Sequence, residues 1–365
     1  MVDENSELRD IKVLMMAPCL GKFGGIEAFC LTLAEDLISR GAEVQILRKM
    51  VSGFHNDGTI ERQEKEMQSS WSANLEKRYF SNFVKPRDQL IKKFLKKSDI
   101  VHLHNPLVEG VYWAKKENKP CVMTIYNWQR RGWYPRLLAW RWAVSKADRR
   151  WYISDFVWKS WEKKRKVFSD RLPVISRMPS GSILNSKRRG FLFVGRWVPK
   201  KGIRVLLEAY RIVSPDPKIW PLSLVGDGPL RQEVENFIHK FELTGVQIHG
   251  FVSEKERHKL TKNSKWMITP PHTQEDLGLT PLEARSVGVP CIASTDGGIL
   301  ETAGKHALFC IPGDVKSLAM CIKKAINMTE VDYAKRAFMA KEDLEDYVRP
   351  LDQYKTEYLK LLESR

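Results

Sequence analysis

The sequence contains no long apolar run. Its first apolar stretch, residues 11–18, is far shorter than the ~20 residues that a membrane-spanning helix needs. The opening residues, MVDENSELRD, are polar and acidic, whereas a secretory signal joins a basic segment to an apolar one. We therefore expect a protein that is made and kept in the cytoplasm, with no membrane-spanning segment.

Paired cysteines are also missing. The six cysteines form no C-x-x-C pair and lie in apolar segments. They are Cys19, Cys30, Cys121, Cys291, Cys310 and Cys321. This usage predicts buried free thiols in a reducing compartment, rather than a disulfide framework or a metal centre.

Two motifs of phosphate and metal chemistry are absent. The glycine loop at residues 21–25 is not followed by the G-K-[ST] of a Walker loop, and the chain has no D-x-D pair that could chelate a metal. His102 and His104 lie two apart on an expected strand and share one face, but no further ligand stands nearby at matched spacing. We therefore predict that they pack or line a cleft.

Positive charge, in contrast, is abundant. The 365 residues carry a net charge of +17. A chain of this length is expected to form two domains, each with its own core. The charge indicates an anionic partner, and nucleic acid, an anionic membrane face and phosphorylated small molecules all fit it.

Apolar strand-like runs alternate with amphipathic helical stretches from Ile11 onward, a pattern typical of a parallel sheet with helices on both faces. Residues 53–97 are polar and weakly periodic, and we assign them to loops and a basic helix. A linker-like segment, PSGSILNSKRR at residues 179–189, separates two series of strands. The strands are IKVLMMAP, EVQILR, IVHLH, CVMTIY and WYIS before the linker, and FLFVGR, LSLVGDG, VQIHGFV, KWMITPP, CIAST and HALFCIP after it. The sequence thus predicts an α/β fold of two Rossmann-like units, with ligands bound outside the carboxyl ends of the strands.

One stretch, Thr269–Glu301, concentrates the candidate chemistry. It predicts a loop with Glu275, a helix that opens near Leu279 and carries Glu283, a strand, and a glycine turn at 297–298. The unpaired N–H groups at a helix start favour an anionic phosphate, and a glutamate on each side of that start can accept hydrogen bonds from sugar hydroxyls. These features favour a nucleotide-sugar site over an ordinary strand-helix-strand unit whose glutamates face water.

A second cationic motif, V-G-R-W-V-P-K-K-G, ends the first strand after the linker. Arg196 and Lys201 can converge there on one diphosphate, because a guanidinium binds oxygens in pairs and an ammonium adds a mobile point charge. The alternative is a solvated basic turn. Lys200 matches no such position and is expected to be surface charge.

These motifs resemble a known family. E-D-L-G-L-T-P-L-E-A, followed by G-V-P-C-I-A-S and a G-G turn, resembles the donor-site signature of retaining GT-B glycosyltransferases of family 4, and R-x4-K-G resembles their phosphate site. The resemblance implies two Rossmann-like domains, with parallel sheets that face each other across a deep cleft. It implies an N-terminal acceptor domain at 1–185, a donor domain at 186–340 and a C-terminal helix at 341–365 that returns to the first domain.

The resemblance also implies roles for individual residues. Arg196 and Lys201 would stabilise the departing diphosphate, Glu275 would hold the donor sugar, and Glu283 would hold the ribose. Further donor-binding candidates are Gly25, Gly226, Phe251, Leu279 and Thr280. Acceptor-side candidates are Gly24, His104 and Tyr126, the last of which stands where many relatives have a histidine.

The function so implied is a retaining, metal-independent transferase that needs no cofactor. It would move a sugar from a UDP- or GDP-sugar to a glycan, glycolipid or lipid-linked acceptor in cell-envelope or polysaccharide biosynthesis. A sugar-nucleotide epimerase or a phosphorylase on the same fold remains an alternative. A basic RNA-binding protein would also explain the charge, but the sequence shows no nucleic-acid module and the glutamates would repel a phosphate backbone.

The positive charge is concentrated between Tyr126 and Lys166. This segment has twelve Lys/Arg against three Asp/Glu, a local charge of +9, together with seven tryptophans. With the basic run Lys92, Lys93, Lys96 and Lys97, it predicts peripheral docking on the anionic inner membrane face, where a membrane-borne acceptor would lie. The alternative is that some tryptophans, Trp151 among them, belong to the core and that the basic residues face water.

Overall fold

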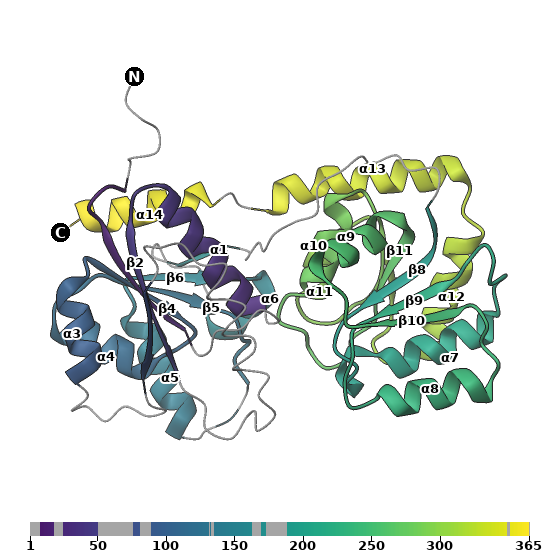
Figure 1. Cartoon of the computed structure of the whole chain (residues 1–365), viewed down its shortest axis with the longest axis horizontal. Helices are drawn as coiled ribbons and strands as arrows, with labels where there is room; N and C mark the ends of the chain where they lie inside the picture. The colour runs from purple at the N-terminus through teal and green to yellow at the C-terminus, as the bar shows by residue number, and fades with distance from the viewer. Residues whose placement is uncertain are drawn as a thin grey trace. The chain divides into compact units, whose positions relative to one another are not determined.

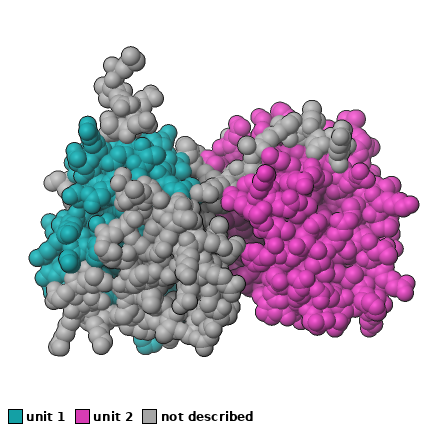
Figure 2. Space-filling view, in the orientation of Figure 1, with its two compact units in different colours: residues 1–176, 349–365 teal, residues 177–348 magenta. Residues whose placement is uncertain are grey.

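The chain forms two compact units. The computed structural model describes residues 8–17, 25–49, 76–80, 89–130, 132, 135–162, 169–172, 188–348 and 351–364. Unit 1 comprises Met1–Ser176 with Arg349–Arg365, and unit 2 comprises Arg177–Val348 (Figure 2). Among the described helices, none has both the length and the apolarity that a bilayer-spanning helix requires.

Unit 1 is built on a parallel sheet of seven described strands in the order β3-β2-β1-β4-β5-β6-β7 (Figure 1). Its strands are β1 (Lys12–Ala17), β2 (Glu43–Lys49), β3 (Glu76–Phe80), β4 (Ile100–His104), β5 (Cys121–Ile125), β6 (Arg149–Tyr152) and β7 (Ser169–Arg171). Its helices are α1 (Gly25–Ser39), α3 (Gln89–Lys97), α4 (Val108–Lys116), α5 (Pro135–Lys146), α6 (Asp155–Trp161) and α14 (Asp352–Glu363). All residues of β4 and β5 are buried, as expected for strands covered on both faces.

Unit 2 repeats this architecture with six described strands in the order β10-β9-β8-β11-β12-β13. They are β8 (Arg189–Val194), β9 (Leu222–Val225), β10 (Val246–Gly250), β11 (Ser264–Thr269), β12 (Cys291–Ser294) and β13 (Leu308–Cys310). The helices are η2 (Pro199–Lys201), α7 (Ile203–Val213), α8 (Arg231–Lys240), α9 (Glu254–Asn263), α10 (Leu279–Ser286), α11 (Ile299–Ala303), α12 (Val315–Ile326) and α13 (Glu330–Tyr347). α7 and α8 lie on one side of the sheet and α9 and α10 on the other (Figure 1).

Alternation along β8 divides the core of unit 2 between the two faces of its sheet. Phe191 and Phe193 pack with the apolar faces of α7 and α12, whereas Leu192 packs with residues of α10 and β12. Helix α7 buries residues three and four apart, including Ile203, Leu206 and Tyr210, which is the spacing of one helical face. The predicted α/β fold of two Rossmann-like units is confirmed.

The predicted strands of both units are present, and α3 is the predicted basic helix. Two strands were missed, β3 and β7, which are the edges of the first sheet. Four of the cysteines, at 30, 121, 291 and 310, are buried free thiols as expected. The predictions at Cys19, Gly21, Gly24, Trp133 and Lys163–Lys166 lie outside the described residues.

The C-terminal segment differs from the single helix expected at 341–365. Residues 341–347 complete α13, which stays in unit 2, and the return to unit 1 begins at Arg349. The reason is packing: Leu344 is buried, and the Ala340 carbonyl accepts a hydrogen bond from the buried Arg285 Nε at 2.9 Å. The first boundary falls at 176/177, against the 185/186 expected from the sequence.

Candidate active site

Lys201 is placed by a close approach between two strand ends of unit 2. It ends η2, and the following Gly202 has φ 74°. A Cβ at Gly202 would lie 1.9 Å from the Pro270 carbonyl oxygen, so this position requires glycine. The approach brings the turn after β8 against the loop after β11, where Lys201 Nζ donates to Glu275 Oε1 at 2.7 Å. Both side chains are only partly buried.

The backbone of Glu275 is held by the glycine turn after β12. The buried Asp296 carboxylate accepts from the N–H of Gln274 at 2.8 Å and of Glu275 at 3.0 Å. Gly298 N–H donates to the Glu275 carbonyl at 2.7 Å. A Cβ at Gly297 would lie 2.2 Å from that same carbonyl oxygen, so a larger residue would push the loop away. The Gly-Gly turn thus sets where Glu275 stands.

Helix α10 begins immediately after this loop, as predicted. Its N-cap is Gly278, and no side chain caps it, so the first N–H groups at Leu279 and Thr280 face a half-exposed region. Glu283 lies further along the helix and is only 4% exposed. Its Oε2 accepts a hydrogen bond from the Arg257 guanidinium of α9. Burial raises the pKa of the Glu283 carboxyl above its usual range, and the Arg257 charge opposes this rise.

Arg196 and Phe251 extend this edge of the sheet. Arg196 follows β8 and is exposed, and within the described chain its guanidinium has no ionic or hydrogen-bonding partner. Phe251 follows β10 and is 63% exposed. Between them, Gly226 N–H donates to the Gly250 carbonyl at 2.8 Å. Cationic, acidic and aromatic groups therefore follow the carboxyl ends of β8, β10 and β11.

Two of the predicted acceptor-side residues of unit 1, His104 and Tyr126, are buried. His104 Nδ1 lies 2.7 Å from the Tyr126 hydroxyl, and neither side chain reaches the surface. His102 Nδ1 lies 2.5 Å from the Tyr358 hydroxyl of α14, and its Nε2 lies 2.8 Å from Thr124 Oγ1. Burial lowers the pKa of His104 to about 3 and that of His102 well below its ordinary value. The two histidines pack, as one of the two predicted alternatives held, and the structure does not show His104 or Tyr126 at an acceptor surface.

Two family matches divide the chain almost at the boundary of the units. Residues 176–341 match Glycosyl transferases group 1, and residues 23–178 match Glycosyltransferase Family 4. The chain is a family 4-like GT-B glycosyltransferase.

Curated relatives agree with this assignment. An uncharacterized glycosyltransferase of Methanocaldococcus jannaschii is 25% identical over 247 residues, 64% of this chain and 67% of the relative. A phosphatidyl-myo-inositol mannosyltransferase of Mycobacterium leprae is 23% identical over 291 residues, 74% of this chain and 75% of the relative. For three curated relatives, the alignment spans 62% to 67% of their length.

Solved structures show the same fold. HepE of Anabaena, in complex with UDP, has a TM-score of 0.75 and 17% identity, with 97% of this chain and 100% of HepE covered. At this identity the likeness supports the GT-B fold of the glycosyltransferase and says nothing about its substrates.

Two site residues of the glycosyltransferase were missed by the sequence analysis, Asp296 and Arg257. Asp296 stands directly before the predicted Gly-Gly turn. An acidic residue at this position could have predicted a carboxylate that accepts hydrogen bonds from backbone N–H groups of a neighbouring loop. Arg257 lies in EKERHKLTKN, where nothing local distinguishes it from the neighbouring lysines. In unit 1, Gly25 begins α1 as expected.

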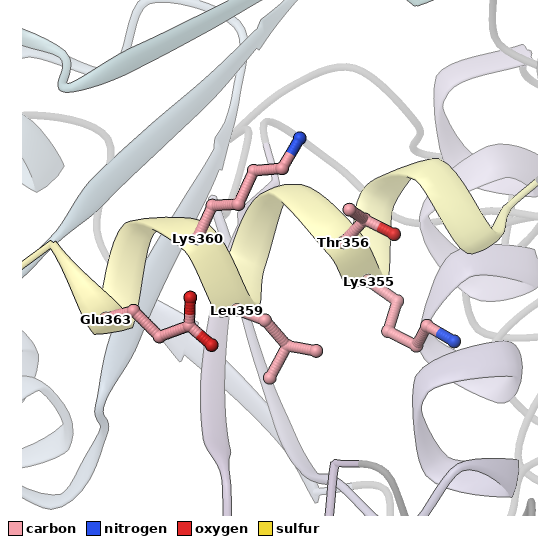
Figure 3. A pocket seen from close by; sticks show the side chains of 5 residues that line it. All are labelled: Lys355, Thr356, Leu359, Lys360 and Glu363. Carbon is pink, nitrogen blue, oxygen red and sulfur yellow. The ribbon is translucent and has the colours of Figure 1, made fainter.

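A concave region of about 540 Å³ lies at the C-terminal helix of the glycosyltransferase (Figure 3). It is lined by Lys355, Thr356, Leu359, Lys360 and Glu363, all of α14. Lys360 and Leu359 point to opposite sides of the helix in this view. Because its lining comes from a single helix and does not converge, we assign no ligand to this region.

Proposed function

We propose that the glycosyltransferase moves a sugar, with retention of configuration, from a UDP- or GDP-sugar to a glycan or lipid-linked acceptor. The observation that carries this proposal is the contact between Lys201 and Glu275 beside the start of α10. It joins the two sequence motifs, one for phosphate and one for sugar, at a single place. Close backbone contacts at Gly202 and Gly297 hold both residues there.

The proposed chemistry follows from the charges. The diphosphate is the leaving group, and negative charge grows on it as the bond to the sugar breaks. Arg196, Lys201 and the N–H groups at the start of α10 would stabilise that charge, so this scheme requires no divalent cation. Glu275 would accept hydrogen bonds from the donor sugar, and Glu283 from the ribose.

Donor binding would also exchange the partner of Lys201. In the structure Lys201 Nζ donates to Glu275 Oε1, which occupies one acceptor oxygen of the carboxylate. A bound diphosphate offers Lys201 stronger acceptors and thereby leaves Glu275 Oε1 for a sugar hydroxyl. The two groups would therefore become available for phosphate and sugar together. Solved complexes of HepE, which shares the GT-B fold, contain UDP and UDP-glucose.

A direct test is the release of nucleoside diphosphate from a panel of sugar nucleotides, with and without membrane extract. We expect release from at least one UDP- or GDP-sugar, enhanced when an acceptor is present. Thermal unfolding gives a second measurement: UDP or GDP should raise the melting temperature, whereas oligonucleotides should not. Stabilisation by oligonucleotides alone would favour the RNA-binding alternative.

The proposal of a membrane-borne acceptor depends on the surface of helix α5. This helix carries Arg136, Arg141 and Lys146 and no acidic residue. It also exposes Leu138 by 45% and Trp142 by 38%. Basic residues beside exposed apolar and indole side chains are the composition of segments that bind at an anionic membrane interface.

The basic and tryptophan-rich segment is not one continuous surface, however. Trp151 is 1% exposed, so it belongs to the core, as the alternative interpretation held. Arg150 is also buried, and its Nη1 donates to Glu162 Oε1 at 2.7 Å. The surface proposed for docking is therefore α5, together with Tyr112, which is 37% exposed on the adjacent α4.

Liposome co-sedimentation tests this part of the proposal. Binding should require anionic lipid, weaken as salt rises, and fall when Arg136, Arg141 and Lys146 are changed to serine. The matched control changes Lys255, Lys259 and Lys262 of α9 to serine, which removes equal charge from unit 2. Equal recovery of the protein with neutral and anionic vesicles at low salt would leave a soluble acceptor as the better account.

A further inference from the structure

The Glu283 carboxylate accepts a side-chain hydrogen bond from a neighbouring helix. Helices α9 and α10 lie side by side on one face of the sheet of unit 2 (Figure 1). From α9, the Arg257 guanidinium donates to Glu283 Oε2. The Glu283 side chain is 6% exposed and that of Arg257 is 25% exposed, so the pair has one buried and one half-buried member.

A carboxylate this deeply buried is unfavourable as an ion unless a cation compensates it. Within the described chain, two charged groups act on Glu283, and both come from α9: Arg257 favours its ionised form and Glu254 disfavours it. The other elements packed on α10, namely α11, α13, β11 and β12, contribute no charge to it. Among the described residues, Arg257 is thus the cation that compensates the Glu283 carboxylate.

The contact also leaves part of Glu283 available. It engages Oε2 through one nitrogen of the guanidinium, not through the paired geometry in which an arginine occupies both carboxylate oxygens. An ionised carboxylate accepts hydrogen bonds at both oxygens, whereas a protonated one uses an oxygen as a donor. A glutamate that is to accept from both hydroxyls of a ribose must therefore stay ionised.

We propose that Arg257 is a positioning residue of the donor site, which keeps the Glu283 carboxylate ionised and oriented for the ribose hydroxyls of the nucleotide. This inference rests on the proposed function, because it requires that the site binds a nucleoside diphosphate. Arg257 does not itself touch the ligand in this scheme. It differs from Lys201, whose ammonium is expected to leave Glu275 for the diphosphate.

The test is calorimetric titration of the full chain with UDP, and with GDP and ADP in parallel, at pH 6 and pH 8. Loss of Arg257 removes the charge that lowers the pKa of Glu283, so protonation extends to higher pH. Arg257→Gln should therefore weaken binding by about 10- to 100-fold at pH 6, the effect of losing hydrogen bonds to a charged group, and by less at pH 8. Arg257→Lys, which retains the charge, should restore most of the affinity.

The matched control is Lys259→Gln on the same helix. Lys259 is exposed and pairs with Glu256 at 3.6 Å, so its loss should leave binding unchanged at both pH values. If Arg257→Gln unfolds the chain, Arg257→Gln combined with Glu283→Gln removes both charges and restores a neutral pair. That double variant should fold and bind like Glu283→Gln alone.

The outcomes separate the two levels of the proposal. If the wild-type chain binds none of the three nucleoside diphosphates, the proposed function fails and the inference fails with it. If the wild type binds but Arg257→Gln binds equally well, the positioning role alone is refuted. A loss that is the same at pH 6 and pH 8, and that Arg257→Lys does not restore, would show that Arg257 only supports the packing of α9.

Discussion

The two units share one architecture, but the polar residues in and after their central strands differ in burial and charge. In unit 1, β4 and β5 carry His102, His104 and Thr124, which are buried. The two histidine rings form hydrogen bonds with the hydroxyls of Thr124 and Tyr126. In unit 2, the loops after β8 and β11 carry Lys201 and Glu275, which are charged and partly exposed. We call the buried groups of unit 1 the sealed edge and the partly exposed loop residues of unit 2 the open edge.

The difference shows how one fold separates packing from ligand binding. The carboxyl edge of a parallel sheet is the general location of ligand sites. In unit 1, residues of β4 and β6 pack against α14: His102 lies against the Tyr358 hydroxyl, and Trp151 lies against the Tyr354 and Tyr358 rings. Burial keeps His104 neutral, because its pKa falls to about 3. The cationic groups proposed for catalysis therefore come from unit 2.

The largest effect is expected at the open edge. Arg196→Ala or Lys201→Ala should lower the turnover number by about 10²- to 10³-fold, because loss of a preorganised charge donor typically costs ~3 to 4 kcal/mol of barrier. Steady-state sugar transfer measures this. Lys200→Ala is the matched control, since Lys200 is exposed and adjacent and should be dispensable. Wild-type turnover in both variants would contradict the proposal that Arg196 and Lys201 bind the diphosphate.

Glu275 and Glu283 should differ in the ligand that their substitution affects. Glu283→Gln is expected to weaken UDP binding by about 10- to 100-fold, because it replaces hydrogen bonds to a charged acceptor. Glu275→Gln should bind UDP at least as tightly as the wild type, since it frees Lys201, while sugar transfer falls. Calorimetric titration decides between the two roles. Equal weakening in both variants would contradict them.

A smaller effect is expected from the residue that holds the Glu275 loop. Asp296→Asn points an amide NH₂ at one of the two backbone N–H groups that Asp296 accepts from, so one of those hydrogen bonds is lost. The turnover number should fall by about tenfold, which corresponds to ~1.4 kcal/mol, with UDP affinity unchanged. Thr295→Ala, at the exposed neighbouring position, is the control. A loss of UDP affinity in Asp296→Asn would show that the whole site has moved.

The smallest effect is expected at the sealed edge, where two tyrosines of α14 form a matched pair. Tyr358→Phe leaves His102 Nδ1 without its partner and should destabilise unit 1 by about 1 to 3 kcal/mol. Tyr354→Phe removes a buried hydroxyl that has no partner in the described chain, so it should have little effect or stabilise unit 1. Hydrogen exchange of unit 1 amides measures both. Equal effects of the two variants would show that the His102 contact is unimportant.

The sequence predicted the open edge better than the sealed one. Motifs such as R-x4-K-G and the paired glutamates act within short stretches, so their spacing is visible in the chain. The contact between Lys201 and Glu275 could not be predicted from the sequence, because it depends on the approach of Gly202 to Pro270 across the sheet. His102 and Tyr358 are 256 residues apart in sequence, and no local pattern links them.

The missed strands have a related cause. β3, EKRYF, and β7, SDR, form the two edges of the first sheet. Edge strands are held by backbone hydrogen bonds on one side and often carry charged residues, so they lack the apolar pattern of the central strands. The predicted start of α10 near Leu279 needed only local signals and is confirmed.

The return of α14 to unit 1 has a consequence for the order of folding during translation. Unit 2 is continuous from residue 177 to 348, so all of it is synthesised before α14. Unit 1 lacks the rings of Tyr354 and Tyr358 until α14 is made, although residues 1–176 are synthesised first. The N-terminal unit is thus the last that can close its core. A premature stop codon after residue 348 would damage the first unit and spare the second.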